Sequence, residues 1–95
     1  MAAIYILYSS SLDKFYVGSC KEITERVHQH LAKHFPEAFT AKANDWTIYF
    51  YLDNLSYQQA RKIELYIKNM KSKKYIENLK RYPELSTKLL RLHPK

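Results

Sequence analysis

The sequence AIYILYSSSLDKFYVG, residues 3–18, has the pattern of a β-hairpin. Residues 3–9 are apolar and rich in β-forming side chains, residues 10–14 supply turn chemistry, and residues 15–18 return as a second strand. Because side chains alternate along a strand, Tyr5 faces away from Ile4, and Tyr16 shares a face with Gly18. Gly18 is the only glycine in the chain, so its place at a strand end predicts either a positive φ or a close approach to its backbone.

The residues after the hairpin predict a helix, a loop and a third strand. Residues 19–22, Ser-Cys-Lys-Glu, match a capping box, so we expect a helix from there to about His34. Residues 35–45 then form a loop of a length that is often functional. Residues 46–52 predict a strand whose bulky residues on both faces indicate a central, covered position in the sheet.

Three further helices are expected in the C-terminal half. Ser56 begins a second capping box for a helix through about Met70, Ser72 is a candidate cap for the next, and Pro83 fits the first turn of the last. The order ββαβααα indicates an α/β layer arrangement in one domain, residues 1–95. The predicted buried stripe of the first of these helices is Ala60, Ile63, Ile67 and Met70. The next helix carries Tyr75, Ile76 and Leu79, and the last bears Leu85, Leu89, Leu90 and Leu92, of which Leu85, Leu89 and Leu92 form a stripe that is either core or a surface for a partner helix.

Composition narrows the class of protein. A hydrophobic content of 46% with 26% charged residues is typical of a soluble globular protein. No apolar run is long enough to span a membrane, and the N-terminus has no export signal. The single cysteine, Cys20, cannot form an internal disulfide, which suits a reducing, cytoplasmic location.

The net charge of +7 is carried by the C-terminal half of the chain. Residues 1–55 hold five Lys or Arg against six Asp or Glu, whereas residues 56–95 hold eleven against three. A one-sided cationic surface attracts polyphosphates through counterion release, although a solvated face that only maintains solubility is an equal alternative. The grouped cations are Lys68, Lys71, Lys73, Lys74, Lys80 and Arg81.

Several residues have side chains suited to phosphodiester chemistry. Glu64 lies at the edge of a predicted buried stripe, where it is either a divalent-metal ligand or the partner of a nearby lysine. Arg26 and His30, four apart on one predicted helix, suit a phosphate, although Arg26 could equally pair with Glu22. Tyrosine needs a cation to act as a base at neutral pH.

Two other kinds of site are disfavoured. Nothing orients a histidine toward Cys20 for thiol nucleophilic chemistry, so a small buried thiol is the commoner outcome. His30 and His34 have the spacing of a zinc pair but lack a matching third ligand.

Together, Ala3-Ile4-Tyr5, Tyr16-Val17-Gly18, Arg26-x-x-x-His30 and Glu64-x-x-Ile67-Lys68 resemble the ordered motifs of the GIY-YIG endonuclease superfamily. Residues 39–46 and 71–74 are similar to its small single-domain group, which resembles the N-terminal nuclease domain of the excision-repair incision subunit. The resemblance implies a small, mainly antiparallel three-stranded sheet flanked by helices. Ala3 replaces the glycine of the family name, and Asn78 is only near the place of a family asparagine.

The resemblance also implies residue roles in a metal-dependent cleavage of DNA. Glu64 would hold one Mg²⁺ or Mn²⁺, Arg26 would neutralise transition-state charge, and Tyr5 would be the general base. Tyr16 and His30 would position water or phosphate. The alternative is a non-catalytic nucleic-acid-binding module that retains the scaffold. The expected nucleic-acid contacts are Lys42, Lys68, Lys71, Lys73 and Lys74.

Overall fold

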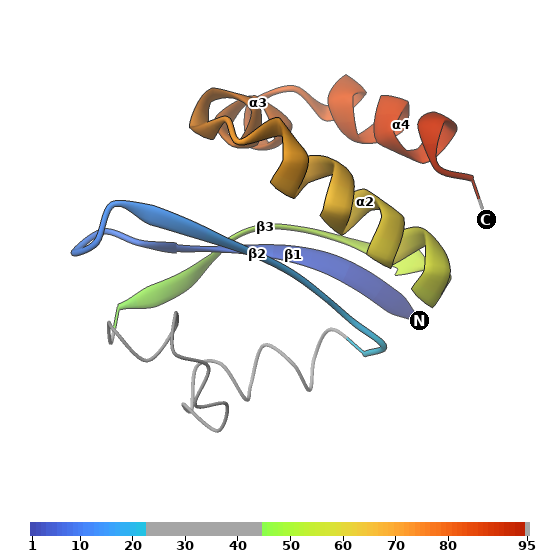
Figure 1. Cartoon of the computed structure of the whole chain (residues 1–95), viewed down its shortest axis with the longest axis horizontal. Coiled ribbons are helices and arrows are strands. Elements are labelled where there is room, and N and C mark those ends of the chain that lie inside the picture. The colour runs from blue at the N-terminus through green and yellow to red at the C-terminus, as the bar shows by residue number, and fades with distance from the viewer. Residues whose placement is uncertain (23–44, 95) are drawn as a thin grey trace.

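The computed structural model describes residues 1–22 and 45–94, which form a three-stranded sheet and three helices (Figure 1). The predicted strands and the three C-terminal helices are confirmed, whereas the helix expected up to His34 lies outside the described residues. None of the described helices is long and apolar enough to cross a membrane. The elements are β1 Ala2–Ser9, β2 Lys14–Cys20, β3 Trp46–Leu55, α2 Tyr57–Met70, α3 Lys73–Arg81 and α4 Pro83–Leu92.

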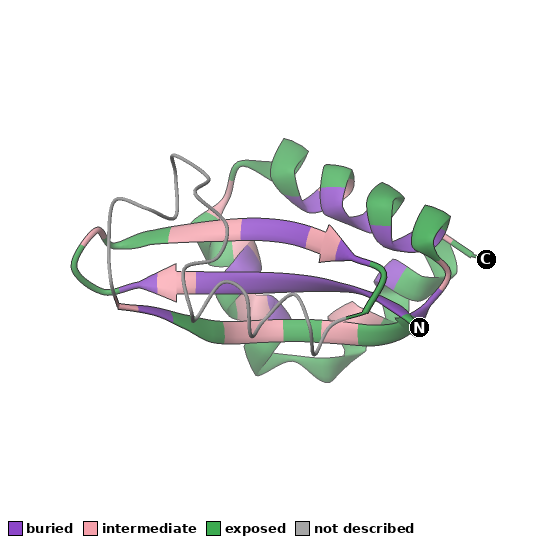
Figure 2. Ribbon diagram, turned by 90° about the horizontal axis from the view of Figure 1, so that it is seen from below, coloured by how far each residue is buried: buried purple, intermediate pink, exposed green. Residues whose placement is uncertain are grey.

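The sheet is antiparallel with the strand order β2-β1-β3, so the first strand is the central one. Residues 2–7 of β1 are buried throughout, and β1 is the most evenly buried strand in Figure 2. The prediction of a central third strand was therefore wrong. β3 is an edge strand of the described sheet whose Ile48 and Tyr51 are 40% and 51% exposed. The many aromatic residues of β3 led to the wrong prediction, because only some side chains of this strand, including Tyr49 and Phe50, pack against the main apolar cluster.

Apolar side chains cover both faces of the sheet and form two separate clusters. Helices α2, α3 and α4 lie on one side (Figure 1), where Ile4, Ile6 and Val17 pack with buried residues of all three helices. The strand residues that alternate with these point to the other face, as the hairpin pattern predicts. That second cluster contains Ala3, Tyr5, Leu7, Cys20 and Trp46, with Tyr16 and Leu12 packed against it.

Local sequence signals set the helix starts as expected. The Ser56 hydroxyl accepts a hydrogen bond from the Gln59 backbone N–H at 3.1 Å, and Ser72 caps α3 in the same way. Pro83 is the first residue of α4. The buried stripe predicted for α2 is confirmed for Ala60, Ile63 and Ile67 but was wrong for Met70, the last residue of the helix. Met70 is 42% exposed, and on α4 Leu90 and Leu92 are 37% and 50% exposed, whereas Leu89 is buried and Tyr75 and Leu85 are partly buried.

The predicted capping box at residues 19–22 was wrong. Ser19 and Cys20 belong to β2, where they pair with Ile4 and Ala3 of the central strand. Pairing with a buried strand outweighs the local preference of serine for a helix N-terminus. Cys20 is a buried thiol, as expected.

Asp45, which immediately precedes β3, binds the turn between β1 and β2. Its carboxylate accepts hydrogen bonds from the hydroxyls of Ser9 at 2.6 Å, Ser10 at 2.9 Å and Ser11 at 3.0 Å, and from the Ser11 backbone N–H at 2.7 Å. These donors, led by Ser9, hold the pKa of Asp45 well below its ordinary value. This contact joins residues more than thirty positions apart, so no local sequence signal indicates it.

We expect Asp45→Asn to lower the melting temperature at neutral pH, because an amide cannot accept all four hydrogen bonds as a carboxylate does. The folded protein depresses the pKa of this carboxyl, so its contribution is complete above the ordinary value of 3.8 and is lost as the pH falls below it. Thermal unfolding of the original protein and of Asp45→Asn between pH 2 and pH 7 measures how the difference in melting temperature depends on pH. A difference in melting temperature that does not narrow in acid would contradict the assignment.

Candidate active site

At Gly18 a side chain of the central strand closely approaches the backbone of β2. Gly18 pairs with Tyr5, and a Cβ at this position would lie 2.5 Å from the Tyr5 hydroxyl oxygen and 2.6 Å from the ring carbon that bears it. Gly18 does not have a positive φ. Of the two explanations predicted for this glycine, the close approach is therefore the correct one. The absent side chain lets the Tyr5 phenol extend across β2.

Tyr16 lies beside this phenol on the same face of the sheet. The ring centroids of Tyr5 and Tyr16 are 6.4 Å apart, and Trp46 packs edge-on against Tyr16 at 6.5 Å. Tyr5 is completely buried, whereas Tyr16 is partly exposed. The two tyrosines predicted as site residues are thus neighbours in the structure, and Tyr16 is the one with a surface toward solvent.

Glu64 lies on α2, 7% exposed, with both carboxylate oxygens engaged. Oε1 accepts a hydrogen bond from the Ser19 hydroxyl and lies 3.7 Å from the Arg61 guanidinium. Oε2 accepts a hydrogen bond from the Lys68 ammonium at 2.7 Å. The lysine partner considered from the sequence is therefore present. Ser19 was missed, because the capping-box interpretation placed it at a helix start.

The two tyrosines and Glu64 approach β2 from opposite faces. Tyr5 and Tyr16 belong to the cluster on the face away from the helices, whereas Glu64 comes from the helix that covers the other face. They come together along one short stretch of β2, because Tyr5 lies over Gly18 and Glu64 is bonded to Ser19, the next residue. β2 is an edge strand of the described sheet, so a substrate at this edge has access to groups from both faces.

Three of the predicted site residues, Arg26, His30 and Lys42, lie outside the described residues. The predicted lysines Lys68, Lys71 and Lys73 all line one pocket beside β2. Lys74 lies elsewhere, in a second pocket between α3 and Tyr49 of β3 that Asn78 also lines.

The donor atoms around Glu64 fit a single hard divalent cation. Within residues 1–22 and 45–94 there is no cluster of three acidic, histidine or cysteine side chains. Mg²⁺ is commonly held by one or two carboxylates, with water and substrate oxygens completing its octahedron. The Glu64 carboxylate and the Ser19 hydroxyl are oxygen ligands of that kind, and the Lys68 side chain, 48% exposed, has room to move away. The residues therefore fit such an ion.

Comparison with known families supports a family assignment for the chain. The family model described as the GIY-YIG catalytic domain matches residues 1–77, which run from the N-terminus to the middle of α3. The chain belongs to the GIY-YIG family. The matched range contains Tyr5, Tyr16 and Glu64. No curated protein and no solved structure matches the chain.

Membership of the GIY-YIG family implies a nuclease, an enzyme that cleaves phosphodiester bonds of nucleic acid. Nucleases of this family generally use a divalent metal. The match establishes the family and not a subgroup within it.

Proposed function

We propose that this protein is a divalent-metal-dependent DNA endonuclease whose active site lies at the edge of β2. The observation that carries the proposal is the juxtaposition at residues 18 and 19. The Tyr5 phenol lies over Gly18, and the Ser19 hydroxyl donates to the Glu64 carboxylate. The phenol over Gly18 supplies a group that can contact the attacking water, and the carboxylate bonded to Ser19 supplies a ligand for a cation.

Each residue has a distinct part in the proposed reaction. Glu64 holds Mg²⁺ or Mn²⁺, which when bound supplies positive charge to the scissile phosphate and the leaving oxygen. Tyr5, in its phenolate form, accepts the proton of the attacking water, and Tyr16 and His30 orient water or phosphate. Arg26 neutralises charge that develops on phosphorus oxygens, for which its planar guanidinium is suited.

In this scheme Lys68 has two partners in turn, the Glu64 carboxylate without substrate and a phosphate of the bound substrate. Its ammonium neutralises the Glu64 carboxylate at 2.7 Å. A bound cation would take over that role, and the half-exposed lysine would then be released toward the nearest phosphate. The exchange keeps the charge around Glu64 compensated with and without substrate.

We also propose a role in DNA repair or recombination. The support is the likeness of residues 39–46 and 71–74 to the small single-domain group, which in turn resembles the nuclease domain of the excision-repair incision subunit. With one active site per chain, the expected product is a nick in one strand.

One observation favours a second candidate, a non-catalytic nucleic-acid-binding module. Glu64 has Lys68, Arg61 and Ser19 as partners, so its charge and its hydrogen bonds are satisfied without a metal. A scaffold that had lost catalysis would be stable in this arrangement. The two candidates differ in whether a divalent cation changes the nucleic acid chemically or only changes how tightly it is bound.

A nicking assay separates them. We expect the purified protein to convert supercoiled plasmid to nicked circles in Mg²⁺ or Mn²⁺, and EDTA to stop the conversion completely. Gel electrophoresis of the products measures this, with branched and single-stranded DNA assayed in parallel. Binding of DNA without cleavage in either metal would favour the non-catalytic module.

A further inference from the structure

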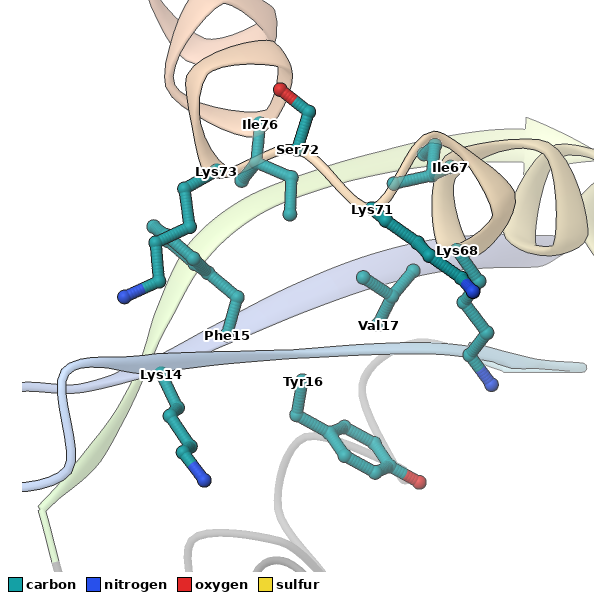
Figure 3. A pocket seen from close by; sticks show the side chains of 10 residues that line it. All are labelled: Lys14, Phe15, Tyr16, Val17, Ile67, Lys68, Lys71, Ser72, Lys73 and Ile76. Carbon is teal, nitrogen blue, oxygen red and sulfur yellow. The ribbon is translucent and has the colours of Figure 1, made fainter.

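A pocket of about 470 Å³ opens between β2 and the junction of α2 with α3 (Figure 3). It adjoins the candidate active site, because Tyr16 and Lys68 line it and Lys68 is one helical turn beyond Glu64. The interior between the strand and the helices is apolar. Its apolar lining consists of Phe15, Val17, Ile67 and Ile76.

Four lysines line the pocket: Lys68, Lys71 and Lys73 come from the helical side, whereas the side chain of Lys14 on β2 points, like that of Tyr16, away from the apolar interior (Figure 3). The Lys73 ammonium is bound to Asp13, at 2.7 Å from the backbone oxygen and 3.2 Å from a carboxylate oxygen, and Lys68 is bound to Glu64. Within the described part of the chain, the ammonium groups of Lys14 and Lys71 have neither a hydrogen bond nor an ion pair. The pocket therefore combines an apolar interior with uncompensated positive charge.

The backbone of Lys71 gives an independent reason to connect this pocket with a ligand. Lys71 ends α2 in the left-handed region, with φ 49° and ψ 40°. Glycine, or less often asparagine, is preferred at this helix position because other side chains are strained there. The other described non-glycine residues with positive φ are Asp13 and Asn54, two types that tolerate it. A lysine in a strained conformation beside a pocket points to a functional use of its charge.

We propose that the pocket binds one unpaired nucleotide of the substrate, with its base against the apolar interior and its phosphate on Lys71. An apolar surface of this size is not needed for a phosphate alone, and the lysines complement the nucleotide's negative charge. In a continuous duplex the faces of the bases are stacked and unavailable.

This inference rests on the proposed function and specifies its substrate class. Because Tyr16 lines the pocket and Ile67 lies one turn from Glu64, the bound nucleotide is adjacent to the phosphodiester that is cut. The preferred substrate is then DNA with an unpaired nucleotide beside the cleavage position, in contrast to an uninterrupted duplex.

The test is a titration without metal, monitored through the methyl signals of Val17, Ile67 and Ile76 by NMR. The probes are two DNA duplexes of one sequence, with and without a single unpaired nucleotide at the centre. We expect the duplex with the unpaired nucleotide to shift the pocket methyls and to bind more tightly. Lys71→Gly should weaken its binding about three- to tenfold through the lost phosphate contact. The same variant should raise the melting temperature, since glycine relieves the positive φ.

Weaker DNA binding together with a higher melting temperature would show that Lys71→Gly removes a ligand contact and does not damage the fold. Lys88→Ala, which removes an exposed charge from α4 outside the pocket, is the matched control and should leave the preference for the unpaired nucleotide unchanged. Equal affinity for both duplexes, unshifted pocket methyls, or equal effects of Lys71→Gly and Lys88→Ala would overturn the inference.

The two proposals fail in different ways. A protein that binds the unpaired nucleotide in this pocket but cleaves no DNA in any divalent metal would contradict the nuclease proposal alone. A protein that nicks both duplexes at the same rate, with unshifted pocket methyls, would contradict the pocket proposal alone.

Discussion

Glu64→Gln is expected to lower metal-dependent cleavage by at least about a thousandfold while the protein remains folded. Glutamine has the same size and can still accept the Ser19 hydrogen bond, but it lacks the negative charge that anchors a cation. The partners that lose their counter-charge, Lys68 and Arg61, are 48% and 55% exposed and can be hydrated. The free energy of unfolding should therefore change by no more than about 1 kcal/mol. Single-turnover cleavage and thermal unfolding measure the two effects.

The matched control is Glu77→Gln, which removes an exposed carboxylate from α3 and should leave cleavage unchanged. Cleavage by Glu64→Gln within a few-fold of the original protein would show that the metal is held elsewhere. A large loss of stability with proportional loss of activity would instead assign Glu64 a structural role.

Gly18→Ala is expected to lower cleavage about a hundredfold, because it displaces the Tyr5 phenol from its position over β2. The added methyl group would lie 2.5 Å from the phenol oxygen, and the ring cannot move without disturbing its packed neighbours. Tyr5 is completely buried, so the same substitution should also destabilise the fold by about 1–3 kcal/mol through overpacking. Cleavage rates and denaturant unfolding measure these two effects.

A double-mutant cycle with Tyr5→Leu identifies the cause of the destabilisation. Leucine removes the end of the ring that meets Gly18, so Gly18→Ala should cost little stability in that background. An equal cost in both backgrounds would show that the glycine is needed for another reason.

Features set by local chemistry were predictable from the sequence. Ser56 and Ser72 cap helices because a serine hydroxyl satisfies a free backbone N–H wherever a helix begins. The opposite faces of Ile4 and Tyr5 follow from the alternation of a strand, which the hairpin pattern already contains.

Features set by contacts between distant segments were not predictable in this way. The position of β3 at an edge depends on how three strands are ordered, which aromatic content does not encode. Ser19 pairs with Ile4 and binds Glu64, forty-five residues away, and both contacts outweigh its capping tendency. The Asp45 contact to the hairpin turn is of the same kind.

The candidate site shows both cases. The motifs that resemble those of the GIY-YIG family predicted Tyr5, Tyr16 and Glu64 as one group. Their approach to β2 from opposite faces required the helix to be placed on the sheet, since a helix pattern does not say which face it will cover. The pocket beside them likewise forms only when α2 and α3 pack against β2.

Broadening of NMR signals by Mn²⁺ tests most directly whether Glu64 and the two tyrosines share one metal-dependent site. Substoichiometric Mn²⁺ is expected to broaden first the amide signals of residues 18, 19 and 64 and the ring signals of Tyr5 and Tyr16, with no early effect on α4. Glu64→Gln should abolish this pattern. Broadening centred on other acidic residues, or broadening near Glu64 that leaves both tyrosine rings unaffected, would contradict the account.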